Sequence, residues 1–178
     1  LTVYPRIPIV VINEVMKDCQ QIGTDDVGEF IELYNLDNVP VDISGWKLSN
    51  NSSEYIVEEG ISIPANSIYL LGRQEEDSND NPNGGYTPDL VYNTIVLDND
   101  SDHILLHTSL DQLVDQFSYS GELSSNATGK SIELIDPLLG NSDINTNWTV
   151  AIELYGNYGL YGTPGVENTL IPDYGNPT

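Results

Sequence analysis

Residues 10–50 read VVINEVMKDCQQIGTDDVGEFIELYNLDNVPVDISGWKLSN and contain several β-strand patterns. Ile31 and Leu33 alternate with a mixed set of apolar, charged and phenolic residues. Because successive side chains of a strand point to opposite faces, this alternation predicts a half-buried strand. Residues 41–48 predict a second extended segment around a Ser-Gly pair, in which Trp46 is large enough to anchor a sandwich core.

Short strand patterns separated by turn residues continue along the whole chain. No stretch keeps a 3.6-residue apolar period over three turns, so helix should be nearly absent. The spacing predicts an all-β sandwich. Its expected strands are 9–12, 29–35, 45–49, 54–57, 67–72, 102–108, 114–119 and 131–135.

The motifs VVINEV, GEFIELYN, PVDISGWKL and IPANSIYLLGR occur in the order typical of the lamin tail domain family. The chain resembles the bacterial branch of that family most, and the resemblance continues to GTPGVEN at 162–168. It implies an immunoglobulin-like β-sandwich over residues 9–168, with long loop insertions at 74–93 and 138–161. Residues 1–8 are then an N-terminal lead-in and residues 169–178 a C-terminal linker.

Charge restricts the classes of partner. The chain has 28 acidic and 5 basic residues and a net charge of −23, which repels nucleic-acid phosphates and anionic membranes. No apolar run reaches the roughly 18 residues that a spanning helix needs, so membrane insertion is not expected. Cys19 is the single cysteine, which excludes an internal disulfide.

One acidic loop carries oxygen ligands at alternate positions: Asp77, Asn79, Asn81 and Asn83. Calcium loops use this alternation and a glycine for the sharp turn, which Gly84 supplies. Leu90 stands where such a loop needs a bidentate glutamate. A calcium site and a solvated insertion rich in turn formers are therefore the two interpretations.

A second cluster, Asp98, Asp100 and Asp102, also alternates carboxylates. Its sixth position is His103 instead of glycine. The cluster predicts either calcium ligands or short side chains that cap a turn by accepting backbone amides.

Three tyrosines, Tyr155, Tyr158 and Tyr161, lie close together in the insertion LYGNYGLYGTPG. Loop tyrosines offer large contact area, so this group predicts a binding surface for a protein or carbohydrate. The alternative is that the three rings cover the sandwich edge and hold the segment that closes the domain.

The carboxylates of the first two strands are a further candidate group. Glu29 and Glu32 are three residues apart and point to opposite faces of a regular strand, so they cannot act as one acid/base pair. Glu14 could pair with one of them across strands. The alternative role for all three is to accept hydrogen bonds from turn amides or to face water. Nucleophile and zinc-protease motifs are absent, so no enzymatic activity is expected.

The resemblance implies a non-catalytic interaction or targeting module of a larger secreted or cell-surface bacterial protein, with a protein or polymer partner. Two alternatives stay open. The first is a calcium-binding surface or adhesion domain, in which bound metal offsets part of the negative charge. The second is an accessory domain of an extracellular hydrolase or nuclease. No cofactor is expected other than calcium.

Overall fold

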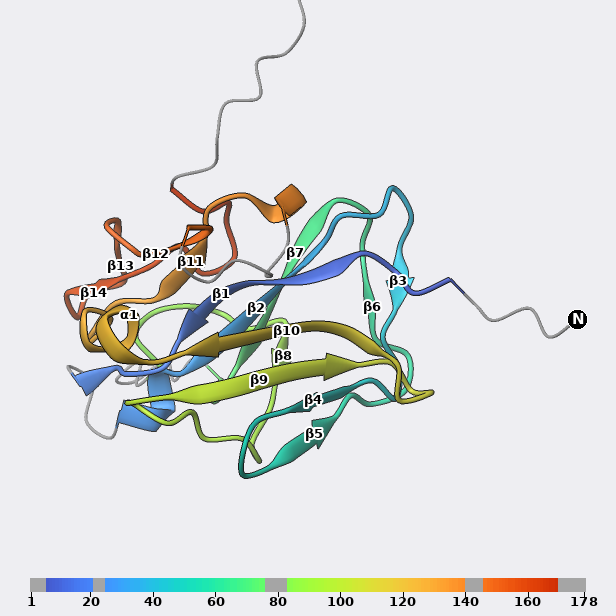
Figure 1. Cartoon of the computed structure of the whole chain (residues 1–178), viewed down its shortest axis with the longest axis horizontal. Coiled ribbons are helices and arrows are strands. Elements are labelled where there is room, and N and C mark those ends of the chain that lie inside the picture. Colours follow the sequence, from blue (N-terminus) through green and yellow to red (C-terminus); the bar gives the residue numbers. More distant parts are fainter. Residues whose placement is uncertain (1–5, 21–24, 76–82, 140–145, 170–178) are drawn as a thin grey trace, which may run out of the picture.

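The computed structural model describes residues 6–20, 25–75, 83–139 and 146–169. Across these residues the chain forms short strands and very little helix (Figure 1). The strands of the first part are β1 (Val10–Met16), β2 (Phe30–Asn35), β3 (Val41–Asp42), β4 (Lys47–Ser49), β5 (Glu54–Ile56), β6 (Ser62–Ile63), β7 (Ser67–Gly72) and β8 (Leu90–Val91). Those of the second part are β9 (Asp102–His107), β10 (Leu113–Tyr119), β11 (Ile132–Leu134), β12 (Trp148–Val150), β13 (Leu154–Tyr155) and β14 (Leu160–Tyr161).

Two sheets form the body of the domain. The first has the order β12-β11-β1-β2-β7-β8 and the second the order β10-β9-β4-β5. Strands β3 and β6 form one small ribbon, and β13 and β14 another. Every pairing is antiparallel except that of β7 with β8. Figure 1 shows β10, β9, β4 and β5 in front of β1, β2 and β7. The predicted immunoglobulin-like β-sandwich is confirmed.

The main core lies between the two sheets, where each contributes one face of branched and aromatic side chains. Ile31 and Leu33 of β2 meet Leu48 and Leu106 of the second sheet in one apolar cluster. Trp46 belongs to the same cluster and is buried, so its predicted role as a core anchor is confirmed.

The prediction that residues 29–35 form a half-buried strand is wrong, because β2 is buried on both faces. Phe30, on the face that should meet water, lies in a second apolar cluster together with Met16 and Cys19. Residues 83–86 and 154–160 cover that face: Tyr86, Tyr155 and Leu160 pack into the second cluster. These coverings come from the insertions, whose fold cannot be read from the strand pattern of β2 itself.

The insertions also add strands to the first sheet. Residues 83–93 supply β8, which extends it beside β7, and residues 146–161 supply β12, which extends it beside β11. Trp148 of β12 stacks on Phe117 of β10, with ring centroids 3.8 Å apart. The second insertion is therefore joined to the main core by a pair of large rings.

Helical structure is sparse within the described ranges, as predicted. It includes α1 (Gly121–Ser125) and the 3-10 turns η2 (Asp25–Gly28) and η3 (Pro137–Leu139). None of the helices in this part of the chain has the length and apolar character that a membrane span needs.

Candidate functional site

A polar cavity of about 550 Å³ opens between the β4–β5 turn and the chain that leads into β9. Residues from both segments, together with one buried carboxylate from the start of β2, form its walls. They are Glu29, Asn50, Asn51, Ser52, Ser53, Thr94, Val96, Leu97, Asp98, Asn99, Ser101 and Asp102.

Asn50 shapes one wall of this cavity. Its side-chain oxygen accepts hydrogen bonds from the amides of Ser52 and Ser53, at 3.0 and 2.9 Å. Its amide nitrogen donates to the backbone oxygen of Val96 and to Asp102 Oδ2, at 2.8 and 2.7 Å. The Asn50 side chain therefore stabilises the β4–β5 turn and links it by hydrogen bonds to the opposite wall of the cavity.

Asp102, the first residue of β9, ties the two walls together from the other side. Its Oδ1 accepts the His103 amide at 2.8 Å and the Asn51 amide at 3.3 Å. Its Oδ2 accepts the Asp98 amide at 3.3 Å in addition to the Asn50 side chain. Buried carboxylates need such partners, and here the partners are backbone amides and the side-chain amide of Asn50.

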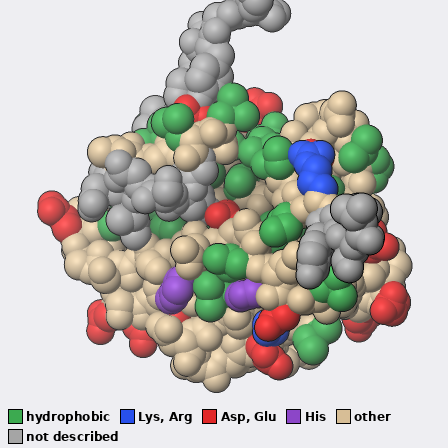
Figure 2. Space-filling view, turned by 45° about the vertical axis from the view of Figure 1, so that its right-hand side comes forward, with side chains coloured by type: hydrophobic (Ala, Val, Ile, Leu, Met, Phe, Trp, Pro, Cys, Tyr) green, Lys and Arg blue, Asp and Glu red, His purple; other side chains and the backbone are tan. Residues whose placement is uncertain are grey.

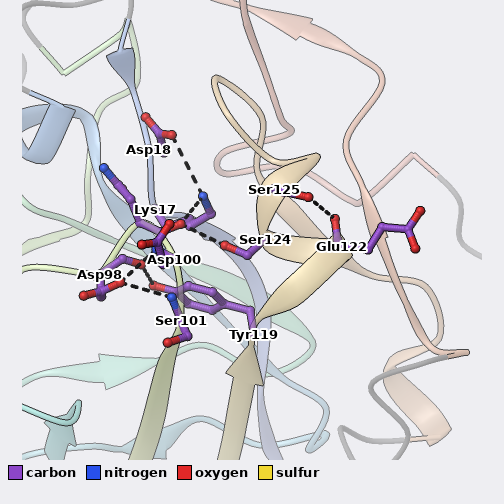
Figure 3. Close-up of polar contacts among 10 residues, drawn as sticks. Lys17, Asp18, Asp98, Asp100, Ser101, Tyr119, Glu122, Ser124 and Ser125 are labelled. Atoms are coloured by element: carbon purple, nitrogen blue, oxygen red, sulfur yellow. Dashed lines mark hydrogen bonds and ion pairs between the residues drawn. The ribbon is translucent and has the colours of Figure 1, made fainter.

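Side chains from three other segments hold the loop of residues 98–102 (Figure 3). Lys17 Nζ and Ser124 Oγ both donate to the Asn99 backbone oxygen at 2.8 Å, and the Tyr119 hydroxyl donates to the Asp98 backbone oxygen at 2.7 Å. The residue that follows β1, strand β10 and helix α1 therefore hold this loop and the cavity wall that it forms.

The cavity is acidic. Glu29 is buried, and its Oε2 accepts the Leu97 amide at 3.1 Å. Asp98 is exposed, and the backbone amides of Ser101 and Asp100 lower the pKa of its carboxyl, so it stays ionised at neutral pH. None of the residues that line the cavity is Lys, Arg or His. Figure 2 shows the same imbalance on one whole face, with acidic side chains around its rim and few basic ones.

Asp98, Asp100 and Asp102 lie together in the structure, but at least two of the three carboxylates already accept backbone amides. Asp98 Oδ1 takes those of Asp100 and Ser101, at 2.8 and 3.1 Å, and both oxygens of Asp102 are occupied. No three His, Cys, Asp or Glu side chains within residues 6–20, 25–75, 83–139 and 146–169 are arranged to hold a metal ion. Calcium at this cluster stays a prediction.

The other predicted calcium ligands are mostly outside the described ranges. Asp77, Asn79 and Asn81 belong to residues 76–82, which the structure does not describe. Asn83 is buried, donates to the Tyr86 backbone oxygen at 2.7 Å and accepts the Gly85 amide at 3.1 Å.

The three predicted surface tyrosines are only partly exposed. Tyr155 packs edge-on to Phe30, with centroids 6.3 Å apart, and Tyr158 packs against the same second cluster. Tyr161 lies under the ammonium of Lys130, 4.9 Å from the ring centroid. The rings thus lie where the covering role would place them, and their role in binding stays a prediction.

Sequence reasoning missed most of the cavity's walls. Asn50, Ser52 and Thr94 stand out by no catalytic or metal-binding spacing. The one usable signal was the run NNSS after a strand, because Asn followed by Ser at a turn predicts side-chain caps on backbone amides.

The two packed sheets define the class: an immunoglobulin-like β-sandwich domain. The chain belongs to the lamin tail domain family, whose sequence model matches residues 6–121. Domains of this family are immunoglobulin-like, non-enzymatic and act in protein interactions. No curated protein matches the chain.

Proposed function

We propose that this domain is a non-catalytic interaction module that binds a cationic segment of a protein partner. One observation carries the proposal: the 550 Å³ cavity is lined by the acidic residues Glu29, Asp98 and Asp102, and none of its lining residues is basic. Such a cavity attracts a Lys or Arg side chain, and amide and hydroxyl groups on its walls can orient that side chain. The net charge of −23 adds long-range attraction for the same partner.

A blocked cavity tests the proposal. Ser52 lines the cavity and is exposed, so Ser52→Trp should fill it without touching the core. We expect this variant to bind fluorescein-labelled hexalysine about tenfold more weakly than the wild type, a difference of about 1.4 kcal/mol. Fluorescence anisotropy measures both affinities.

Two controls separate the cavity from general charge attraction. Asn157→Trp adds the same ring at an exposed position that does not line the cavity, and it should bind like the wild type. Labelled hexaglutamate should not bind any of the proteins. Equal affinity of Ser52→Trp and Asn157→Trp for hexalysine would show that the cavity is not the binding site.

We also propose that the domain serves a larger secreted or cell-surface bacterial protein, including an extracellular hydrolase or nuclease to which it would be an accessory. Support comes from the acidic, Asn- and Ser-rich composition and from the resemblance to bacterial members of the family. The domain then supplies binding, and an attached domain supplies any chemistry.

Calcium binding is the alternative function, favoured by the alternation of oxygen ligands in the two acidic loops. If the native state holds calcium, millimolar calcium should raise the melting temperature relative to a chelator, because a ligand of the native state adds stability by mass action. Differential scanning fluorimetry at low ionic strength checks this. An unchanged melting temperature removes the alternative.

A further inference from the structure

Three glutamates lie side by side on the face of the six-stranded sheet opposite the main core. Glu14 of β1 is in register with Glu133 of β11 on one side and with Glu32 of β2 on the other. Each is at most 1% exposed. Residues directly opposite on neighbouring strands have Cβ atoms about 5 Å apart, so three carboxyl groups share one buried space. We call these three residues the glutamate row.

Residues 162–168, which we call the closing segment, cover the glutamate row. The Thr163 amide donates to Glu14 Oε1 at 2.8 Å, and the Gly165 amide donates to Glu32 Oε2 at 2.7 Å. The closing segment is therefore fastened to the sheet by the carboxyl groups that it buries.

The hydrogen bonds of Thr163 favour a proton on the glutamate row. Thr163 Oγ1 lies 3.0 Å from Glu14 Oε2, 3.2 Å from Glu133 Oε1 and 3.4 Å from Asn168 Oδ1. A hydroxyl has one hydrogen to donate, and an ionised carboxylate has none. Two full two-centre hydrogen bonds to the carboxyl groups form only when Glu14 or Glu133 is protonated and donates to the hydroxyl oxygen; without that proton, the one hydroxyl hydrogen is shared between two acceptors.

The orientation of Asn168 shows that its side chain does not supply the additional hydrogen. Its amide nitrogen donates to the backbone oxygens of Asn13 and Leu134, at 3.0 and 2.8 Å. Its side-chain oxygen is therefore the atom that faces Thr163 and the Asn13 side chain, and an oxygen cannot supply the missing hydrogen. A proton that completes both hydrogen bonds therefore has to come from a carboxyl group.

The electrostatic surroundings also favour protonated carboxyl groups in the glutamate row. Burial raises the pKa of Glu14 to about 7, and it also raises the pKa values of Glu32 and Glu133. Charge repulsion adds to this, from Glu14 on Glu32 and from Glu153 on Glu133. The hydrogen bonds from Thr163, Gly165, Ser131 and Asn13 lower these pKa values but do not cancel the effect of burial.

The other titratable groups nearby do not offset the negative charge that the glutamate row carries when it is ionised. Tyr155 of β13 stays neutral, because burial raises its pKa. The ammonium of Lys130 lies over the Tyr161 ring, where it forms a cation–π contact. Glu167, within the closing segment itself, is exposed.

We propose that the closing segment is a proton-dependent latch, which stays docked while the Glu14–Glu133 pair holds a proton and loosens when the glutamate row ionises fully. A carboxyl group whose pKa is raised by docking stabilises the docked state at low pH and loses that contribution as pH rises through the docked pKa. Docking should therefore weaken through neutral pH. Opening would expose the glutamate row to solvent or to a partner.

Amide hydrogen exchange measured by NMR tests the latch in the intact chain. With a pKa of about 7 when docked and 4.5 when free, Glu14 alone should lower the protection factors of the Thr163 and Gly165 amides about tenfold between about pH 6 and about pH 8.5. Amides within β9, corrected for the intrinsic exchange rate, should keep their protection. Protection of Thr163 and Gly165 that does not change with pH would overturn the proposal.

Glu14→Gln separates a proton latch from a purely structural contact. Its side-chain oxygen can still accept from Ser131 and Thr163, and its NH₂ group can donate to Thr163 Oγ1 as a protonated carboxyl does. We expect the change in its Thr163 protection factor over the same pH range to be about tenfold smaller than in the wild type, because residue 14 no longer titrates. Glu58→Gln, at an exposed site, should keep the wild-type profile. A wild-type pH profile in Glu14→Gln would refute the latch.

Discussion

Replacing Trp148 with alanine is expected to lower the free energy of unfolding by about 4 kcal/mol, because deleting a buried aromatic ring removes apolar burial and leaves a cavity. Trp148 is 5% exposed and stacks on Phe117, which belongs to the second sheet. It lies outside the part of the chain that the family model matches, residues 6–121. The loss therefore measures how far residues 146–161 belong to the same cooperative unit.

Urea unfolding followed by circular dichroism gives this free energy. Ile152→Ala is the matched control, since Ile152 lies two residues beyond β12 and is 59% exposed; its loss should stay below about 0.5 kcal/mol. A loss below about 1 kcal/mol for Trp148→Ala would mean that the insertion is an appendage and that the predicted domain of residues 9–168 is too long.

Lys17→Met should have the second largest effect, a loss of about 3 kcal/mol, because it removes the cation from a buried ion pair and leaves the partner charge behind. Lys17 Nζ lies 3.9 Å from Asp18 Oδ2, and both side chains are buried. The same ammonium donates to the Asn99 backbone oxygen, which holds the cavity wall in place. Methionine has a similar length, so the change isolates the charge.

Lys47→Met is the control for this variant. Lys47 pairs with Asp111 at 2.7 Å, but Asp111 is largely exposed, and surface pairs contribute about 0–1 kcal/mol. Thermal unfolding of both variants at the same pH and salt concentration compares them. Equal losses in Lys17→Met and Lys47→Met would contradict the structural role given to the buried lysine.

The sandwich could be predicted from the sequence because local signals agree with one another. The alternation of Ile31 and Leu33, the turn residues between strands and the position of Trp46 all point to two packed sheets. The face on which each of these residues lies follows from the two-residue period of a strand, and the structure places all three in the main core.

The segments that cover the outer face of the six-stranded sheet could not be predicted, because their positions depend on contacts between distant parts of the chain. Glu32 reads as a solvent-facing residue of β2, yet the Gly165 amide, 133 residues away, covers it. Strands β8, β12, β13 and β14 have two or three residues each, which is too short for an alternating pattern.

The candidate cavity could not be predicted from the sequence either, because its walls come from segments that are far apart in the chain. Asp98 and Asp102 were singled out as alternating carboxylates, but their partner Asn50 comes from a turn about fifty residues earlier, so no local spacing connects them. No sequence pattern singles out Glu133. The sequence leaves open whether Glu14 pairs across strands with Glu29 or Glu32, and the register of β1 with β2 places it opposite Glu32. The third member follows only from the register of β11.

Titration of ¹⁵N-labelled protein with hexalysine, followed by amide chemical shifts, tests the central claim most directly. The binding of a cationic segment in the cavity predicts that the largest shifts occur at Asn51, Ser52, Thr94 and Ser101, and that they weaken as salt is raised from about 20 mM to about 300 mM. Shifts spread evenly over the acidic surface, or centred on residues 151–162, would contradict it.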